Sequence, residues 1–218
     1  MSGCGCESNV QFDGMSKAYK RILWIVIGIN FAMFVVEMVA SQLSSSQALS
    51  ADALDFFADS LTYTITLIAI GQSIKWRARA ALLKGVSLLV MGGWVVTSTL
   101  YQVFVLEVPG ELIMGTIAIM AFCANMVSVL LLLKYRDGDS NIRSVWLCSR
   151  NDAIGNLAVL AAAILVGITQ SRWPDLIVAF LMAGLFLHSA ILIIKQARME
   201  MTQAKLDVQQ CAIKTSDN

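Results

Sequence analysis

The sequence predicts an all-α, polytopic membrane protein with six transmembrane helices and both termini in the cytoplasm. Three observations lead to this fold class. Apolar residues make up 57% of the 218 residues and charged residues only 14%, whereas soluble domains have about 45–50% and about 25%. The apolar residues gather in six stretches of about 20 residues, the length that a helix needs to cross a bilayer. The positive charges gather in alternate connections between these stretches.

The six spans follow one another with short connections. We expect them at residues 22–43, 47–73, 80–105, 111–133, 143–168 and 174–195. The polar residues 1–20 form a cytoplasmic tail, residues 21–197 a six-helix transport domain, and residues 198–218 a second short cytoplasmic tail. The stretch KQARMEMTQAKL, which begins at Lys195 and runs into that last tail, has a composition that can continue the sixth helix.

The distribution of Lys and Arg sets the orientation. Fourteen of the 16 basic residues lie before the first span, in or near the second and fourth connections, or from the end of the sixth span onward. The opposite connections contain only Arg172, and Arg150 lies inside a span. Because cytoplasmic loops carry the excess of Lys and Arg, we expect both termini in the cytoplasm. The expected location is the inner (plasma) membrane of the cell.

Composition also excludes several function classes. The net charge of +1 offers no field for a nucleic-acid partner. One His and no visible nucleophile–base set argue against an enzyme, and no permanently bound cofactor is expected. The expected partners are therefore the lipid bilayer and small ions.

Five acidic residues fall inside the expected spans. A charged side chain at the centre of a bilayer costs at least about 2.5–3.5 kcal/mol, so such residues face the bundle interior and commonly mark an ion path. They are Glu37 in the first span, Asp52, Asp55 and Asp59 in the second, and Asp152 in the fifth.

The spacing of these residues points to a metal site. Asp55 and Asp59 are four residues apart and share one helical face, and so do Cys148 and Asp152. If the two faces meet, three carboxylates and one sulfur surround a point, which is the ligand number of a tetrahedral divalent-metal site. A fifth helix that begins near Ser140 would bring the two pairs level in the membrane. The alternative is that the carboxylates only fix helix packing and that Cys148 is a small apolar filler.

Other residues are weaker candidates. Asp52 and Glu37 could accept a hydrogen bond near the site or relay protons, and Asn151 could do the same or replace Cys148 as a ligand. Asn30 and Asn125 suit hydrogen bonds between helices better than metal binding.

These residues resemble signatures of the cation diffusion facilitators, a family of metal/proton antiporters. The stretch LSADALDFFAD is similar to the family's second-helix motif, with Asp55 and Asp59 on its two ligand positions. The stretch CSRNDAIGNLA is similar to the fifth-helix motif, with Asp152 on the Asp position and Cys148 where His is usual. The likeness covers roughly residues 20–197 and implies alternating access, loading from the cytoplasm and a homodimer. Typical members continue into a cytoplasmic domain, which this sequence does not include.

The sequence therefore predicts a secondary transporter that exports a divalent transition metal in exchange for protons. Crowded carboxylates cannot all carry charge at low cost, so the empty site holds protons that a metal displaces on binding. A mixed oxygen and sulfur set suits Zn²⁺ and Cd²⁺. The alternatives are a metal-selective channel and a membrane metal sensor.

Overall fold

The computed structural model describes residues 17–68, 74–104, 108–135 and 140–216. Within these helices the side chains of residues 66, 74, 75, 77, 78, 135, 140–148, 200 and 203–216 are not described. Cys148 and the cysteines at positions 4 and 6 thus lie outside the described side chains.

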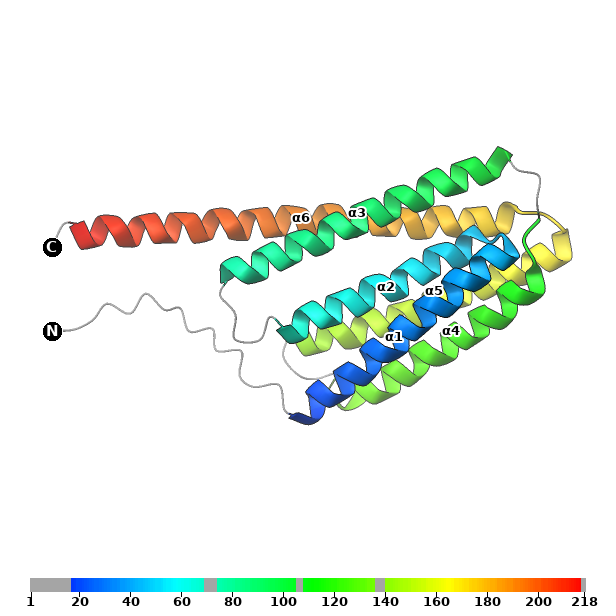
Figure 1. Ribbon diagram of the computed structural model, residues 1–218, viewed down its shortest axis with the longest axis horizontal. Helices are drawn as coiled ribbons and strands as arrows, with labels where there is room; N and C mark the ends of the chain where they lie inside the picture. Colours follow the sequence, from blue (N-terminus) through cyan, green and yellow to red (C-terminus); the bar gives the residue numbers. More distant parts are fainter. Residues whose placement is uncertain (1–16, 69–73, 105–107, 136–139, 217–218) are drawn as a thin grey trace.

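The described residues form six α-helices and one short 3-10 turn, so the expected helix number is confirmed (Figure 1). The helices are α1 (Lys17–Ser44), α2 (Gln47–Ile68), α3 (Ile74–Phe104), α4 (Glu111–Leu132), α5 (Ser140–Thr169) and α6 (Trp173–Ser216), with η1 (Leu133–Tyr135) after α4. The fifth helix begins at Ser140 as expected, and the sixth continues well past residue 195, away from the bundle.

Hydropathy alone separates α2 from the other helices. Five of the described helices are long and apolar enough to cross a membrane, and α2 is not among them. Its three aspartates explain the difference, because each one lowers the mean hydropathy of a helix of 22 residues.

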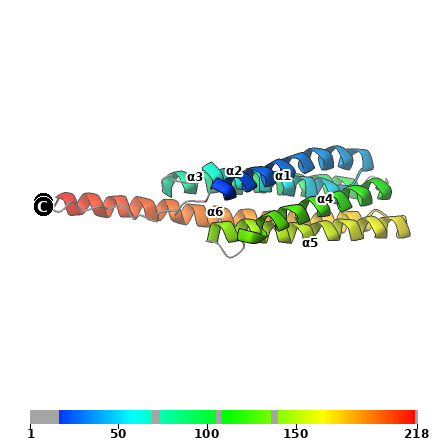
Figure 2. The same cartoon turned by 90° about the horizontal axis from the view of Figure 1, so that it is seen from below.

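The helices pack in pairs: α1 with α2, α4 with α5, and α3 with α6. In Figure 1, α3 and α6 cross along one side of the molecule, and the other four helices form a bundle beside them. In Figure 2, α1, α2 and α3 lie on one side and α4, α5 and α6 on the other.

The close contact between α3 and α6 depends on two glycines. A Cβ atom at Gly85 would lie 2.7 Å from Ile194 Cγ1, and one at Gly92 would lie 3.0 Å from Leu187 Cδ2. Small residues at such positions let two helix backbones approach closely, as is common between transmembrane helices.

A tight turn and a buried carboxylate fix the start of α2. Ser45 adopts a positive φ of 54°, which reverses the chain within two residues after α1. Ser46 Oγ then accepts a hydrogen bond from the backbone N–H of Leu49 at 3.0 Å, as an N-cap residue does. Asp175, in the first turn of α6, accepts hydrogen bonds from Ser46 Oγ and from the N–H groups of Gln47 and Ala48 at 2.6, 2.8 and 3.0 Å. The aspartate from α6 thus satisfies the free amides that begin α2.

Two apolar layers enclose the middle of the four-helix bundle. One layer lies at the end of the bundle where α1 begins, and its buried members include Leu23, Tyr63 and Leu132. The other lies toward the opposite end and includes Leu49, Met114 and Val159. The buried polar residues Asn30, Glu37 and Asn125 lie along their helices between these two layers, away from the helix ends.

Candidate metal site

A small pocket lies in the centre of the four-helix bundle. Each of the four helices contributes to its walls: Asn30 from α1, Asp55 and Phe56 from α2, Asn125 from α4, and Asp152 from α5. The space between these side chains is narrow. Apart from the ring of Phe56, these walls consist of carboxyl and amide groups, which are suitable ligands for divalent cations.

The acidic faces of α2 and α5 meet at this pocket, as the spacing predicts. Asp55 and Asp59 both lie within hydrogen-bonding reach of the carboxyl group of Asp152. Asp59 is 9% exposed, so it sits at the edge of the interior. The two motifs therefore lie at the same level of the bundle.

The structure does not show a complete ligand set. Among the side chains that it describes, no group of three or more His, Cys, Asp or Glu residues is arranged to hold a metal ion. The fourth predicted ligand, Cys148, lies outside the described side chains. The three aspartates thus approach one another in pairs, and their role as ligands stays a prediction.

Tyr63 is a neighbour of the site that the sequence interpretation missed. Its hydroxyl donates a hydrogen bond to Asp59 Oδ2 and lies 3.4 Å from Ser149 Oγ on α5. Tyr63 follows Asp59 by four residues, so the same spacing that pairs Asp55 with Asp59 could have identified it. The tyrosine links the acidic face of α2 to α5 on the side away from Asp55.

Glu37 and Asp52 form a second acidic pair close to the pocket. They are 0% and 1% exposed, and their carboxyl groups lie near each other. Neither oxygen of Glu37, nor Oδ2 of Asp52, has a hydrogen-bond partner within the described part of the chain. Asp52 precedes Asp55 by one helical turn, so this pair lies about 4.5 Å farther toward the start of α2.

Asn30 and Asn125 differ from the expected interhelical links. Asn30 Nδ2 donates to the carbonyl of Val26 at 2.8 Å, which is a bond within its own helix. Asn125 Oδ1 has no hydrogen-bond partner among the residues that the structure describes. Both side chains line the pocket instead.

Asn151 and Lys84 lie at the periphery. Asn151 is exposed, its Oδ1 accepts a hydrogen bond from Arg150 Nη2 at 3.4 Å, and it does not appear among the described pocket walls. Lys84 of α3 is close enough to interact electrostatically with Asp55 and Asp59. Sequence reasoning counted Lys84 only as a basic residue near a connection.

The arrangement of two acidic motifs on facing helices can be compared with known families. Residues 23–201 match the model of the cation efflux transmembrane domain. The chain belongs to the cation efflux family. This membership confirms the resemblance that the second- and fifth-helix motifs indicated.

Three relatives illustrate the range of this cation efflux family. The "cadmium, cobalt and zinc/H(+)-K(+) antiporter" of Bacillus velezensis is 25% identical over 209 residues, which cover 87% of this chain and 66% of that protein. The "zinc transporter ZitB" of Yersinia pestis is 28% identical over 84% of this chain and 63% of its own length. The "metal cation efflux system protein CzcD" of Cupriavidus metallidurans is 23% identical over 74% and 55%. The chain thus spans less than two thirds of the length of these cation efflux proteins.

Proposed function

We propose that the chain is the membrane part of a secondary transporter that exports divalent transition metals, chiefly Zn²⁺ and Cd²⁺, in exchange for protons. One observation carries the proposal: Asp55 and Asp59 of α2 converge with Asp152 of α5 beside a central pocket. Membership of the cation efflux family and the zinc, cadmium and cobalt named for its relatives support the same function.

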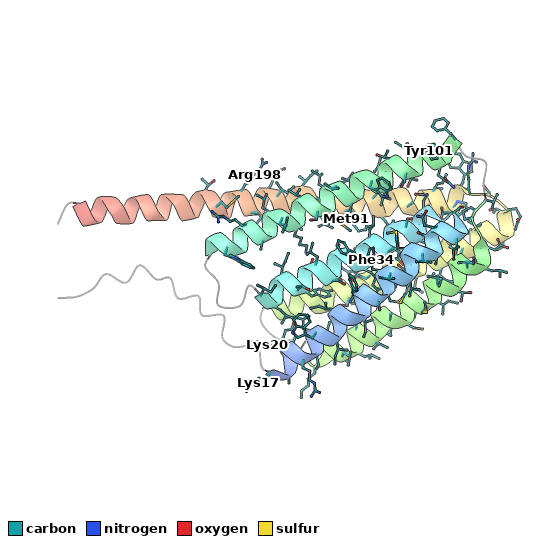
Figure 3. The ribbon with its side chains drawn as sticks, viewed as in Figure 1. Lys17, Lys20, Phe34, Met91, Tyr101 and Arg198 are labelled. Carbon is teal, nitrogen blue, oxygen red and sulfur yellow. The ribbon has the colours of Figure 1, made fainter. Side chains whose placement is uncertain are left out.

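The proposal includes six transmembrane spans, namely the five helices that hydropathy identifies and, in addition, α2. The aspartates of α2 face the pocket and the neighbouring helices rather than lipid, so the helix can cross the bilayer within the bundle. Figure 3 supports an orientation with both termini in the cytoplasm: Lys17 and Lys20 lie at one end of the bundle, and Tyr101 lies at the other. The end with the lysines would face the cytoplasm of a cell with this protein in its inner (plasma) membrane.

Proton exchange follows from the chemistry of the pocket. Three carboxyl groups that lie within reach of one another repel when all are ionised, so the metal-free site retains protons. A divalent cation replaces those protons, because carboxylate ligands bind metal in the deprotonated form. Movement of α2 and α5 to expose the pocket on the opposite side would let protons return and release the metal. The family resemblance further implies a homodimer.

Transport by purified protein in liposomes tests this function. The measurement is the initial rate of uptake of Zn²⁺, Cd²⁺, Co²⁺, Fe²⁺ and Mn²⁺ under imposed pH gradients. We expect Zn²⁺ and Cd²⁺ uptake that is driven by the gradient and that stops when the gradient is collapsed. Metal flux that is indifferent to the gradient would indicate a channel, and the absence of flux from folded protein would indicate a sensor.

A further inference from the structure

Asn125 occupies an unusual position on α4. The buried face of this helix consists of Met114, Ala118, Ala121, Asn125, Ser128 and Leu132, which recur every three or four residues. Small or apolar side chains suffice at such a buried position. Asn125 is nevertheless only 1% exposed, and its Oδ1 has no hydrogen-bond partner in the described part of the molecule. An unpaired, buried amide oxygen is unfavourable, so its presence requires an explanation.

Packing does not supply that explanation. Ser128 on the same face of α4 donates its hydroxyl to the carbonyl of Ala124 at 3.1 Å, and Asn30 across the pocket donates its amide to Val26 at 2.8 Å. These two buried polar groups therefore find partners within their own helices. The oxygen of Asn125 instead belongs to a side chain that lines the pocket together with Asp55 and Asp152.

The charge balance of the pocket favours a neutral donor there. Three ionised aspartates around a divalent cation leave a net charge of −1. A thiolate from Cys148 as the fourth ligand would leave −2, which is costly in an interior of low dielectric constant unless another cation or a proton compensates. An amide oxygen adds a ligand and no charge, and carbonyl oxygens are common ligands of divalent cations that prefer oxygen.

We propose that Asn125 Oδ1 is a ligand of the transported divalent cation, contributed by α4 to the site formed by α2 and α5. This inference rests on the function proposed above. The amide oxygen makes the site richer in oxygen than the two paired motifs alone. It therefore favours cations that accept oxygen ligands readily, such as Mn²⁺ and Co²⁺, more than it favours Cd²⁺.

Direct metal binding to the detergent-solubilised protein tests the inference. The probes are Mn²⁺, Co²⁺ and Cd²⁺, followed by calorimetry, and the absorption spectrum of bound Co²⁺ reports the number and type of its ligands. Asn125→Leu removes the oxygen at similar volume, and Asn125→Asp keeps an oxygen. Ser128→Ala is the matched control, since it removes a buried polar group of α4 that already has a partner.

We expect Asn125→Leu to weaken Mn²⁺ and Co²⁺ binding at least tenfold, to weaken Cd²⁺ binding less, and to change the Co²⁺ spectrum. Asn125→Asp should retain Co²⁺ binding with a shifted spectrum, and Ser128→Ala should match the unmodified protein. If Asn125→Leu does not fold, the spectrum of Asn125→Asp decides: an unchanged spectrum would overturn the inference. Unchanged affinities and spectrum in folded Asn125→Leu would also overturn it.

The failure of this inference can be told apart from the failure of the proposed function. If Asp152→Ala loses metal binding and Asn125→Leu does not, the site on α2 and α5 stands and the role of Asn125 is overturned. If the unmodified protein itself binds none of the three metals, the proposed function fails, and this inference fails with it.

Discussion

Asp175 of α6, which caps the start of α2, and Asp52 of α2 itself are two buried carboxylates with opposite surroundings. Asp175 is fully buried, and its two oxygens accept three hydrogen bonds at the start of α2. Asp52 is 1% exposed, lies beside Glu37, and has one oxygen without a partner among the described residues. The two sites differ because free amide groups exist only at a helix end, whereas the amides beyond the first turn of α2 are used within the helix.

The comparison predicts which acidic residues of this bundle contribute to stability and which to transport. A carboxylate that is paired with a helix N-terminus stabilises the fold and has no need of a further cation. Carboxylates without such partners in the middle of the bundle require a proton or a metal ion to offset their charge. We therefore expect changes at the end of α2 to affect stability, and changes near the pocket to affect transport.

The largest effect is expected at the pocket itself. Asp152→Ala removes the carboxyl group that lies within reach of both Asp55 and Asp59. We expect the uptake rate of every metal to fall by more than about 100-fold, which exceeds the loss typical of changes around a metal ligand. Liposome uptake measures the rate, and Ser128→Ala serves as the control. Normal uptake by Asp152→Ala would contradict a site shared by α2 and α5.

The second-largest effect is expected on the stability of the fold when Asp175 is changed. Asp175→Ala leaves the Ser46 hydroxyl and two backbone N–H groups without their acceptor. We expect a loss of about 2–3 kcal/mol of stability, from the cost of a lost cap and unpaired buried donors. Thermal unfolding in detergent measures it. Asp52→Asn is the matched comparison, and it should leave the unfolding temperature unchanged or raise it, because it removes a buried charge. A greater loss with Asp52→Asn than with Asp175→Ala would reverse our assignment of the two residues.

A smaller and more selective effect is expected at Cys148. Cys148→Ser replaces a soft donor with a hard one at nearly constant volume. We expect Cd²⁺ affinity to fall about tenfold, Zn²⁺ affinity to fall less, and Mn²⁺ and Co²⁺ affinity to change little, because sulfur favours softer metals. Calorimetry with each metal checks the order. The same small change for all four metals would mean that Cys148 only fills space.

The smallest effect is expected far from both carboxylates. In Figure 1, the last part of α6 extends away from the other helices, and Figure 3 places Arg198 before this extension. Deletion of the residues after Arg198 should leave the uptake rate within about twofold, since terminal segments that make few contacts tolerate removal. Loss of uptake by a correctly inserted truncation would show that the extension takes part in transport or assembly.

The sequence by itself determined the helices of this protein and which acidic residues lie within them. Long apolar stretches indicated six helices, and the structure places their ends within a few residues of the expected positions at most boundaries. The spacing of Asp55 and Asp59 defined one face of α2, and Asp152 marked the facing side of α5. These features depend on hydropathy and on the 3.6-residue period, which act within a single helix.

The tertiary structure alone decided which side chains share the pocket and which are paired elsewhere. Asn125 joins Asp55 and Asp152 because α4 presents its buried face to them. Asp175 caps a helix whose first residues precede it by more than 120 positions. Both arrangements depend on how the helices rotate, tilt and cross. Those variables are fixed by packing among all six helices, so no periodicity within one segment can reveal them.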